Sequence, residues 1–137
     1  MTESNILEKK ELFQKFLDFC KEQLELDSLP KIKLLTDTNY SVTHHSFGGY
    51  NPEAKDIRLA IAGRHPVDVC RTLAHELTHY KQDINGQLKD NSGETGSPEE
   101  NEANSVAGII MRNFGKLNPE IYEWELETYL KAVGIPK

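Results

Sequence analysis

The sequence predicts an α+β fold in a single domain, and the order of its periodic segments carries that prediction. A long amphipathic stretch comes first, three short extended segments follow, and three more helical stretches complete the chain. The 137 residues are enough to bury one core without disulfide bonds. We therefore expect one domain over residues 1–137.

The first helix is expected from about Asn5 to Leu26, where apolar residues recur at helical spacing. Its inner side consists of Leu12, Phe13, Phe16, Leu17, Cys20 and Leu24. Alternating or β-branched residues then predict three strands, at Lys31 to Thr36, Val42 to Phe47 and Asp56 to Ala62. Gly48-Gly49 and Asn51-Pro52 supply the turn between the second and third strands. We expect a small, mostly antiparallel sheet.

The helices after the sheet have clear start and stop signals. One begins at Pro66 and runs to about Asn85, with Gly86 just past its end as a cap. Ser97 is the N-cap of the next helix, which continues through Phe114. A last helix is expected over residues 118–134, with an apolar stripe of Tyr122, Leu126, Tyr129, Leu130 and Val133.

The helix that begins at Pro66 contains HELTH, from His75 to His79, which is an HExxH motif. On a helix the two histidines lie one turn apart on the same face, so two imidazoles can bind one metal ion. Glu76 is adjacent and can take a proton from a water that zinc activates. A separate apolar stripe is formed by Val69, Leu73, Leu77, Tyr80 and Ile84. The alternative is a solvated helix with incidental histidines.

A catalytic zinc has three protein ligands and one open position. No histidine follows His79 in the sequence, so an acidic residue further along the chain is required. The candidates are Glu94, Glu99, Glu100 and Glu102.

Helical geometry favours Glu100 or Glu99 over Glu102 as the ligand. Glu100 or Glu99 lies nearer the edge of the expected buried face than Glu102 does. Asn104, one turn after Glu100, shares its face and can orient a ligand histidine. Glu100 also has an ordinary structural reading, because Ser97 and Glu100 match the capping-box pattern. We predict that Glu100 is the third ligand.

The remaining polar residues have ordinary structural readings beside functional ones. His44 and His45 lie on a predicted strand, so only one of them can face a cleft. His65 is expected to start the metal-binding helix. Arg64 and Arg71 can bind a substrate carboxylate or stabilise an oxyanion, and surface salt bridges are the simpler interpretation of both.

Composition excludes several classes of function. The net charge is −6 and no long block of Lys or Arg occurs, which argues against nucleic acid as the main partner. Cys20 and Cys70 each lie in an apolar helical pattern and are expected to be reduced core residues. No apolar run reaches transmembrane length and the first residues are polar, so we expect a cytoplasmic protein without a membrane partner.

HELTH followed by Glu100-Asn101-Glu102-Ala103-Asn104 is similar to the ExxA(D/N) signature of gluzincin-type metallopeptidases. The chain looks most like the minimal single-domain members, the minigluzincins and the SprT-like and ImmA/IrrE-like peptidases, often encoded by tailed bacteriophages and bacteria. The resemblance covers roughly residues 47–112. Many gluzincins have Asp at the position of Asn104, and Asn can still accept a hydrogen bond from an imidazole.

The resemblance implies a minimal zincin-like fold with His75, His79 and Glu100 as zinc ligands and Glu76 as general base. It also implies that the strand at Asp56 to Ala62 is the edge strand along the cleft, where an extended peptide adds by β-augmentation. For a phage-encoded protein, the compartment would be the host cytoplasm.

The leading hypothesis is a zinc-dependent peptidase that hydrolyses peptide bonds. One alternative is a zinc-bearing regulatory or virion-associated structural module with little catalysis. The other is a cell-wall peptide amidase. Retention of Glu76 argues against a purely structural zinc site, because the general base contributes nothing to metal binding.

Overall fold

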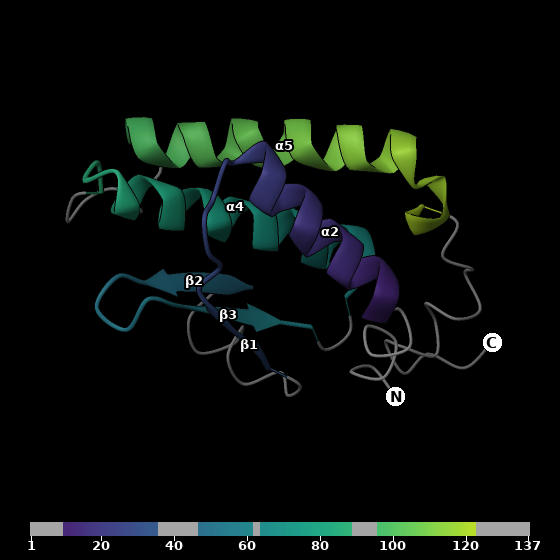
Figure 1. The fold of residues 1–137 in the computed structure, drawn as a ribbon, viewed down its shortest axis with the longest axis horizontal. Coiled ribbons are helices and arrows are strands. Elements are labelled where there is room, and N and C mark those ends of the chain that lie inside the picture. Colours follow the sequence, from purple (N-terminus) through teal and green to yellow (C-terminus); the bar gives the residue numbers. More distant parts are fainter. Residues whose placement is uncertain (1–9, 36–46, 62–63, 89–95, 123–137) are drawn as a thin grey trace.

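The computed structural model describes residues 10–35, 47–61, 64–88 and 96–122. It has the predicted α+β class, with three helices and a three-stranded sheet in the described ranges. The elements are α2 (Lys10–Gln23), β1 (Lys31–Leu35), β2 (Gly48–Asn51), β3 (Asp56–Ala60), α4 (Pro66–Ile84), α5 (Pro98–Leu117) and a short 3-10 turn, η1 (Pro119–Ile121). Helix α4 lies between the sheet and α5, and α2 crosses beside both helices (Figure 1).

Helix α4 is the central element of the core, and both of its ends are where the sequence predicts them. It begins at Pro66, preceded by His65, whose Nδ1 accepts a hydrogen bond from the Val67 backbone N–H. Gly86 follows the helix with a positive φ of 71°. The predicted apolar stripe is buried except for Ile84, which is 53% exposed because it lies in the last turn, beyond the core.

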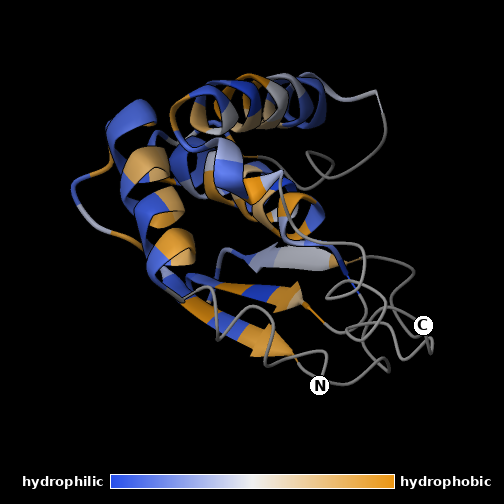
Figure 2. Ribbon diagram, turned by 90° about the vertical axis from the view of Figure 1, so that its right-hand side faces the viewer, coloured by the Kyte–Doolittle hydropathy of each residue, from blue (hydrophilic) through white to orange (hydrophobic). Residues whose placement is uncertain are grey.

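Helices α2 and α5 pack against each other and against α4. The rings of Phe16 and Phe114 meet edge to face with centroids 5.0 Å apart. The predicted inner side of α2 faces the core, as the hydropathy colouring in Figure 2 shows. The helix ends at Gln23 rather than Leu26, because Glu25 adopts a left-handed φ of 54°. Helix α5 starts as predicted but continues three residues beyond Phe114.

The sheet is mixed rather than mostly antiparallel. Its strand order is β1-β3-β2, and β3 pairs parallel with β1 and antiparallel with β2. The prediction that Asp56 to Ala62 forms an edge strand is therefore wrong, because β3 is the central strand. Ile57 and Leu59 are fully buried there. Alternation of apolar residues defines which face of a strand is buried, but it does not identify the neighbours with which the strand pairs.

Strand β2 occupies the segment predicted to be a turn. Of the strand predicted at Val42 to Phe47, residues 42–46 lie outside the described residues, and Phe47 immediately precedes β2. The turn falls instead at residues 52–55, where Asn51 Oδ1 accepts hydrogen bonds from the backbone N–H groups of Glu53 and Ala54. Gly48 and Gly49 therefore lie in a strand rather than in a turn, and Gly48 packs closely against α4.

Two sets of contacts hold β2 against α4. A Cβ atom at Gly48 would lie 2.6 Å from Thr72 Cγ2 and 3.5 Å from Glu76 Cγ, so glycine permits this close approach. At the other end of β2, the Tyr50 hydroxyl donates a 2.5 Å hydrogen bond to Asp83 on α4. The Lys55 ammonium forms a 2.7 Å ion pair with the same carboxylate. The sheet is therefore fixed beside the HExxH helix at both ends of β2.

Gly48→Ala is expected to destabilise the protein by about 1–3 kcal/mol, because the added methyl group overlaps Thr72. Gly108→Ala is the matched control. Position 108 lies inside α5 with no atom within 4 Å of an added Cβ, so alanine should stabilise by about 0.5–1 kcal/mol. Urea unfolding of both variants measures the difference. Equal effects would contradict the close packing of β2 on α4.

Other predictions fall partly or wholly outside the described residues. The segment predicted to open the last helix forms the 3-10 turn Pro119–Ile121, and residues 123–137, with most of the predicted stripe, lie outside. His44 and His45 lie outside as well. Cys20 and Cys70 are buried core residues, as predicted, and burial raises the pKa of both thiols. None of the helices in the described ranges is long and apolar enough to span a bilayer.

Candidate metal centre

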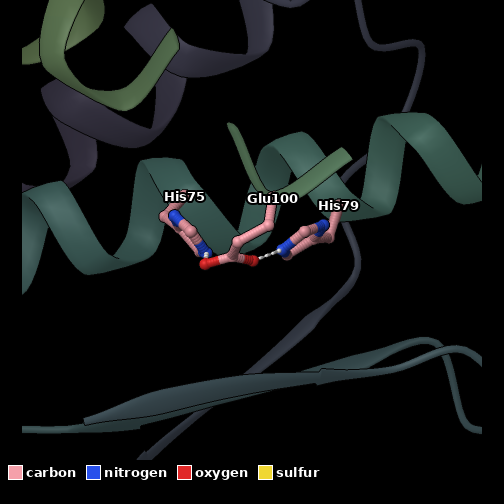
Figure 3. A group of neighbouring side chains, drawn as sticks. All are labelled: His75, His79 and Glu100. Carbon is pink, nitrogen blue, oxygen red and sulfur yellow. Dashed lines mark hydrogen bonds and ion pairs between the residues drawn. The ribbon is translucent and has the colours of Figure 1, made fainter. Parts of the chain in front are cut away.

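The structure brings together the three residues predicted to be metal ligands. His75 and His79 come from successive turns of α4, and Glu100 comes from the first turn of α5. The Glu100 carboxylate lies between the two imidazoles (Figure 3), with Oε2 3.1 Å from His75 Nε2 and Oε1 3.0 Å from His79 Nε2. One ligand atom from each residue lies within 4.8 Å of the others. This group could hold a metal ion.

The donor set fits zinc. Two imidazole nitrogens and one carboxylate oxygen are the protein ligands of many catalytic zinc sites. Tetrahedral ligand atoms about 2.0–2.1 Å from zinc are roughly 3.3 Å apart. Each histidine Nε2 lies 3.0–3.1 Å from an oxygen of Glu100, but the two contacts use different oxygens. Three ligand atoms, one from each residue, lie within 4.8 Å of one another. With three protein ligands, a tetrahedral zinc would keep a fourth position for a water or a substrate.

Among the described residues, the other acidic candidates, Glu99 and Glu102, do not join this group. Glu102 accepts a 2.7 Å hydrogen bond from the Gln82 side chain, and Glu99 is absent from the metal-binding group. Glu94 lies outside the described residues. The capping-box alternative for Glu100 is half present: Ser97 Oγ accepts from the Glu100 backbone N–H, while the Glu100 carboxylate contacts the histidines.

Asn104 hydrogen-bonds His75, which is the kind of contact the sequence predicts for it with a ligand histidine. Burial lowers the pKa of His75, while the nearby Glu100 carboxylate and the hydrogen bond to Asn104 oppose that shift. Repulsion from His79 lowers the pKa of His75 further. The neutral imidazole, which is the form that binds metal, is thereby favoured at neutral pH.

Gln82 is the functional candidate that the sequence reasoning missed. Its side chain is 1% exposed and its Oε1 lies 2.8 Å from His79 Nδ1. Its Nε2 donates to the Glu99 carbonyl at 3.0 Å and to Glu102 Oε1 at 2.7 Å. The one signal in the sequence was its position three residues after His79, which places both side chains on the same side of a helix.

Glu76 is buried beside the group without belonging to it. Its side chain is 8% exposed, and burial raises its pKa to about 7. His79 opposes this rise in pKa, and repulsion from Glu100 adds to it. A cavity of about 330 Å³ opens directly next to Glu76 and His75. A carboxyl group that exchanges its proton near neutral pH therefore faces space that a small group could occupy.

In the metal-free protein, the raised pKa of Glu76 predicts a pH-dependent stability. Between pH 4.5 and about 7 the folded state holds a proton that the unfolded state has lost, so stability falls as pH rises through this window. The Glu76→Gln variant has no titrating group at this position. Its free energy of unfolding relative to that of wild type should therefore rise by on the order of 2 kcal/mol as the pH goes from about 5 to 8. Urea unfolding at both pH values measures this. A difference that does not change with pH would contradict it.

The two arginines have different roles in the structure. Arg64 donates to the Ala60 carbonyl at 2.8 Å and to Thr72 Oγ1 at 2.7 Å, and its guanidinium lies 4.3 Å from the centre of the Phe47 ring. Among the described residues, Arg64 forms these contacts in place of the surface salt bridge expected for it, and its side chain joins β3 to the start of α4. Arg71 is exposed and lines the cavity beside Glu76.

Comparisons with protein-family models, with curated proteins and with solved structures found no match. The fold and the site define an α+β protein in which an HExxH helix and a glutamate from the following helix form a group that could hold a metal ion.

Proposed function

We propose that the protein is a zinc-dependent peptidase of the gluzincin type. The observation that carries this proposal is the convergence of His75, His79 and Glu100, with Glu76 buried next to them and facing a cavity. Two imidazole nitrogens together with one carboxylate are donors that suit zinc. A glutamate beside the ligands contributes nothing to metal binding, so its presence favours hydrolysis over a structural role.

Each residue then has a defined task. His75, His79 and Glu100 hold the metal, which when bound would polarise a carbonyl group and make a water molecule more acidic. Glu76 takes a proton from the attacking water and delivers it to the leaving amine nitrogen. Its burial supports this task, because a carboxylate with a pKa near 7 both accepts and releases a proton at neutral pH.

We place the peptide substrate along β2, not along β3 as the sequence suggested. Strand β2 is an outer strand among the described strands, and it packs directly on α4. Gly48 lines the cavity beside Glu76, so this end of β2 lies next to the proposed reaction site. An extended peptide added to this edge would bring its backbone carbonyl groups to the metal side of α4.

The test is digestion of a denatured protein mixture and of purified cell wall, side by side, by untagged protein. Fragments from the protein mixture that disappear with a zinc chelator and return with added zinc are expected. Release from cell wall alone would indicate an amidase. Cleavage of neither substrate by zinc-loaded protein would favour a regulatory or structural module and contradict the peptidase proposal.

A further inference from the structure

We propose that Gln82 is a positioning residue that fixes His79 in its metal-binding tautomer and ties the Glu100 turn of α5 to α4. The proposal rests on the proposed function in one respect, since it takes His79 and Glu100 to be metal ligands. Gln82 would touch neither metal nor substrate. Its effect would pass through the two ligands on either side of it.

The orientation of the Gln82 amide is fixed by its partners. The amide nitrogen has two hydrogens, and two oxygen acceptors lie within hydrogen-bonding distance of it, the Glu99 carbonyl at 3.0 Å and Glu102 Oε1 at 2.7 Å. Neither acceptor could bond to the amide oxygen. Gln82 Oε1 is therefore the atom that faces His79 Nδ1 at 2.8 Å.

That orientation selects one form of His79. An amide oxygen only accepts, so the His79 Nδ1 must carry a hydrogen and donate it. In a neutral ring the lone pair then lies on Nε2, which faces Glu100 Oε1 at 3.0 Å. The Nε2 lone pair and the Glu100 oxygen are both acceptors, and they face each other in a partly buried site. This arrangement requires a positive charge between them or on the ring. A bound metal ion meets that requirement.

The same amide also holds the segment that supplies Glu100. Its two acceptors are the Glu99 carbonyl and the Glu102 carboxylate. In the sequence they precede and follow Glu100, which lies in the first turn of α5. One buried side chain on α4 thus connects His79 with the helix turn of the third ligand. Glu102, a candidate ligand in the sequence, serves in this account as the anchor for Gln82.

The chain offers clean variants for a test. Gln82→Met keeps the approximate length of the side chain but removes its oxygen and its amide hydrogens. A cavity of about 240 Å³ lies against Gln82, so Gln82→Ala is a second variant that enlarges existing space if methionine prevents folding. Gln87→Met makes the same chemical change at an exposed position that lines the same cavity and serves as the control. Glu102→Ala removes one acceptor, and Glu102→Gln retains an oxygen in its place.

Two measurements test the proposal, one of the His79 tautomer and one of the zinc affinity. Nitrogen-15 NMR of the metal-free protein reports the protonated ring nitrogen of His79, and competition with a chromophoric chelator reports zinc affinity. Wild type should show His79 protonated at Nδ1, and Gln82→Met should show a mixture of tautomers. Zinc affinity should fall roughly 10–100-fold in Gln82→Met and stay unchanged in Gln87→Met. Glu102→Ala should lose about fivefold in affinity and Glu102→Gln should recover it.

A His79 tautomer that Gln82→Met or Gln82→Ala leaves unchanged, with zinc affinity within about twofold of wild type, would overturn the proposal. Equal affinities for Glu102→Ala, Glu102→Gln and wild type would overturn the part that concerns α5. Neither measurement uses peptide hydrolysis. A protein that holds zinc but cleaves nothing would therefore refute the peptidase function while leaving this inference intact. The tautomer comparison uses metal-free protein, so it tests the effect of Gln82 on His79 even if zinc does not bind.

Discussion

Glu100→Ala is expected to weaken zinc binding by more than 100-fold, beyond the roughly 10–100-fold loss typical when a residue outside the ligand set is removed. The physical reason is that Glu100 supplies the only carboxylate in the group formed with His75 and His79 among the described residues. Two imidazoles alone would remain. The measurement is competition for zinc with a chromophoric chelator at neutral pH.

The control for Glu100→Ala is Glu99→Ala, which removes the preceding acidic side chain from the same helical turn. The hydrogen bond from Gln82 to residue 99 uses the backbone carbonyl, which alanine retains. Zinc affinity should therefore stay close to that of wild type. Retained zinc in Glu100→Ala together with lost zinc in Glu99→Ala would show that the third ligand has been assigned to the wrong residue.

Glu76→Gln is expected to lower the rate of peptide hydrolysis by about 10²–10⁴ while the zinc content stays at the wild-type level. Glutamine fills the same buried space beside the cavity but cannot take a proton from water. The measurement is the turnover of a peptide substrate identified from the protein digest, paired with elemental analysis of the same samples. Glu120→Gln, the same change at an exposed position, should retain full activity.

Either of two results would contradict the role given to Glu76. Full activity in Glu76→Gln would mean that another group is the base. Loss of zinc along with activity would mean that Glu76 supports the metal directly, in place of acting on water.

The parts of the site that follow from local geometry could be predicted from the sequence. His75 and His79 share a helical face through their four-residue spacing alone. Glu100 could be placed near the edge of the buried face of α5, because the apolar residues from Ala103 to Phe114 define that face through helical spacing. Asn104 followed from the same register.

The parts that depend on pairing between distant segments could not be predicted. The alternation in β3 indicates a strand, but its central place between β1 and β2 depends on partners that local pattern does not specify. In the sequence Gly48 resembles a turn residue. In the structure the Thr72 methyl group lies too close to leave room for a side chain at this position. Gln82 is an ordinary polar helix residue in sequence, and its importance appears only when α5 packs beside it.

The most direct test of the central claim is the zinc content of the untagged wild-type protein, measured by elemental analysis. We expect about one zinc per chain, held by His75, His79 and Glu100. Protein that is purified without zinc and takes up none when zinc is added would contradict the claim, and the peptidase proposal would fail with it.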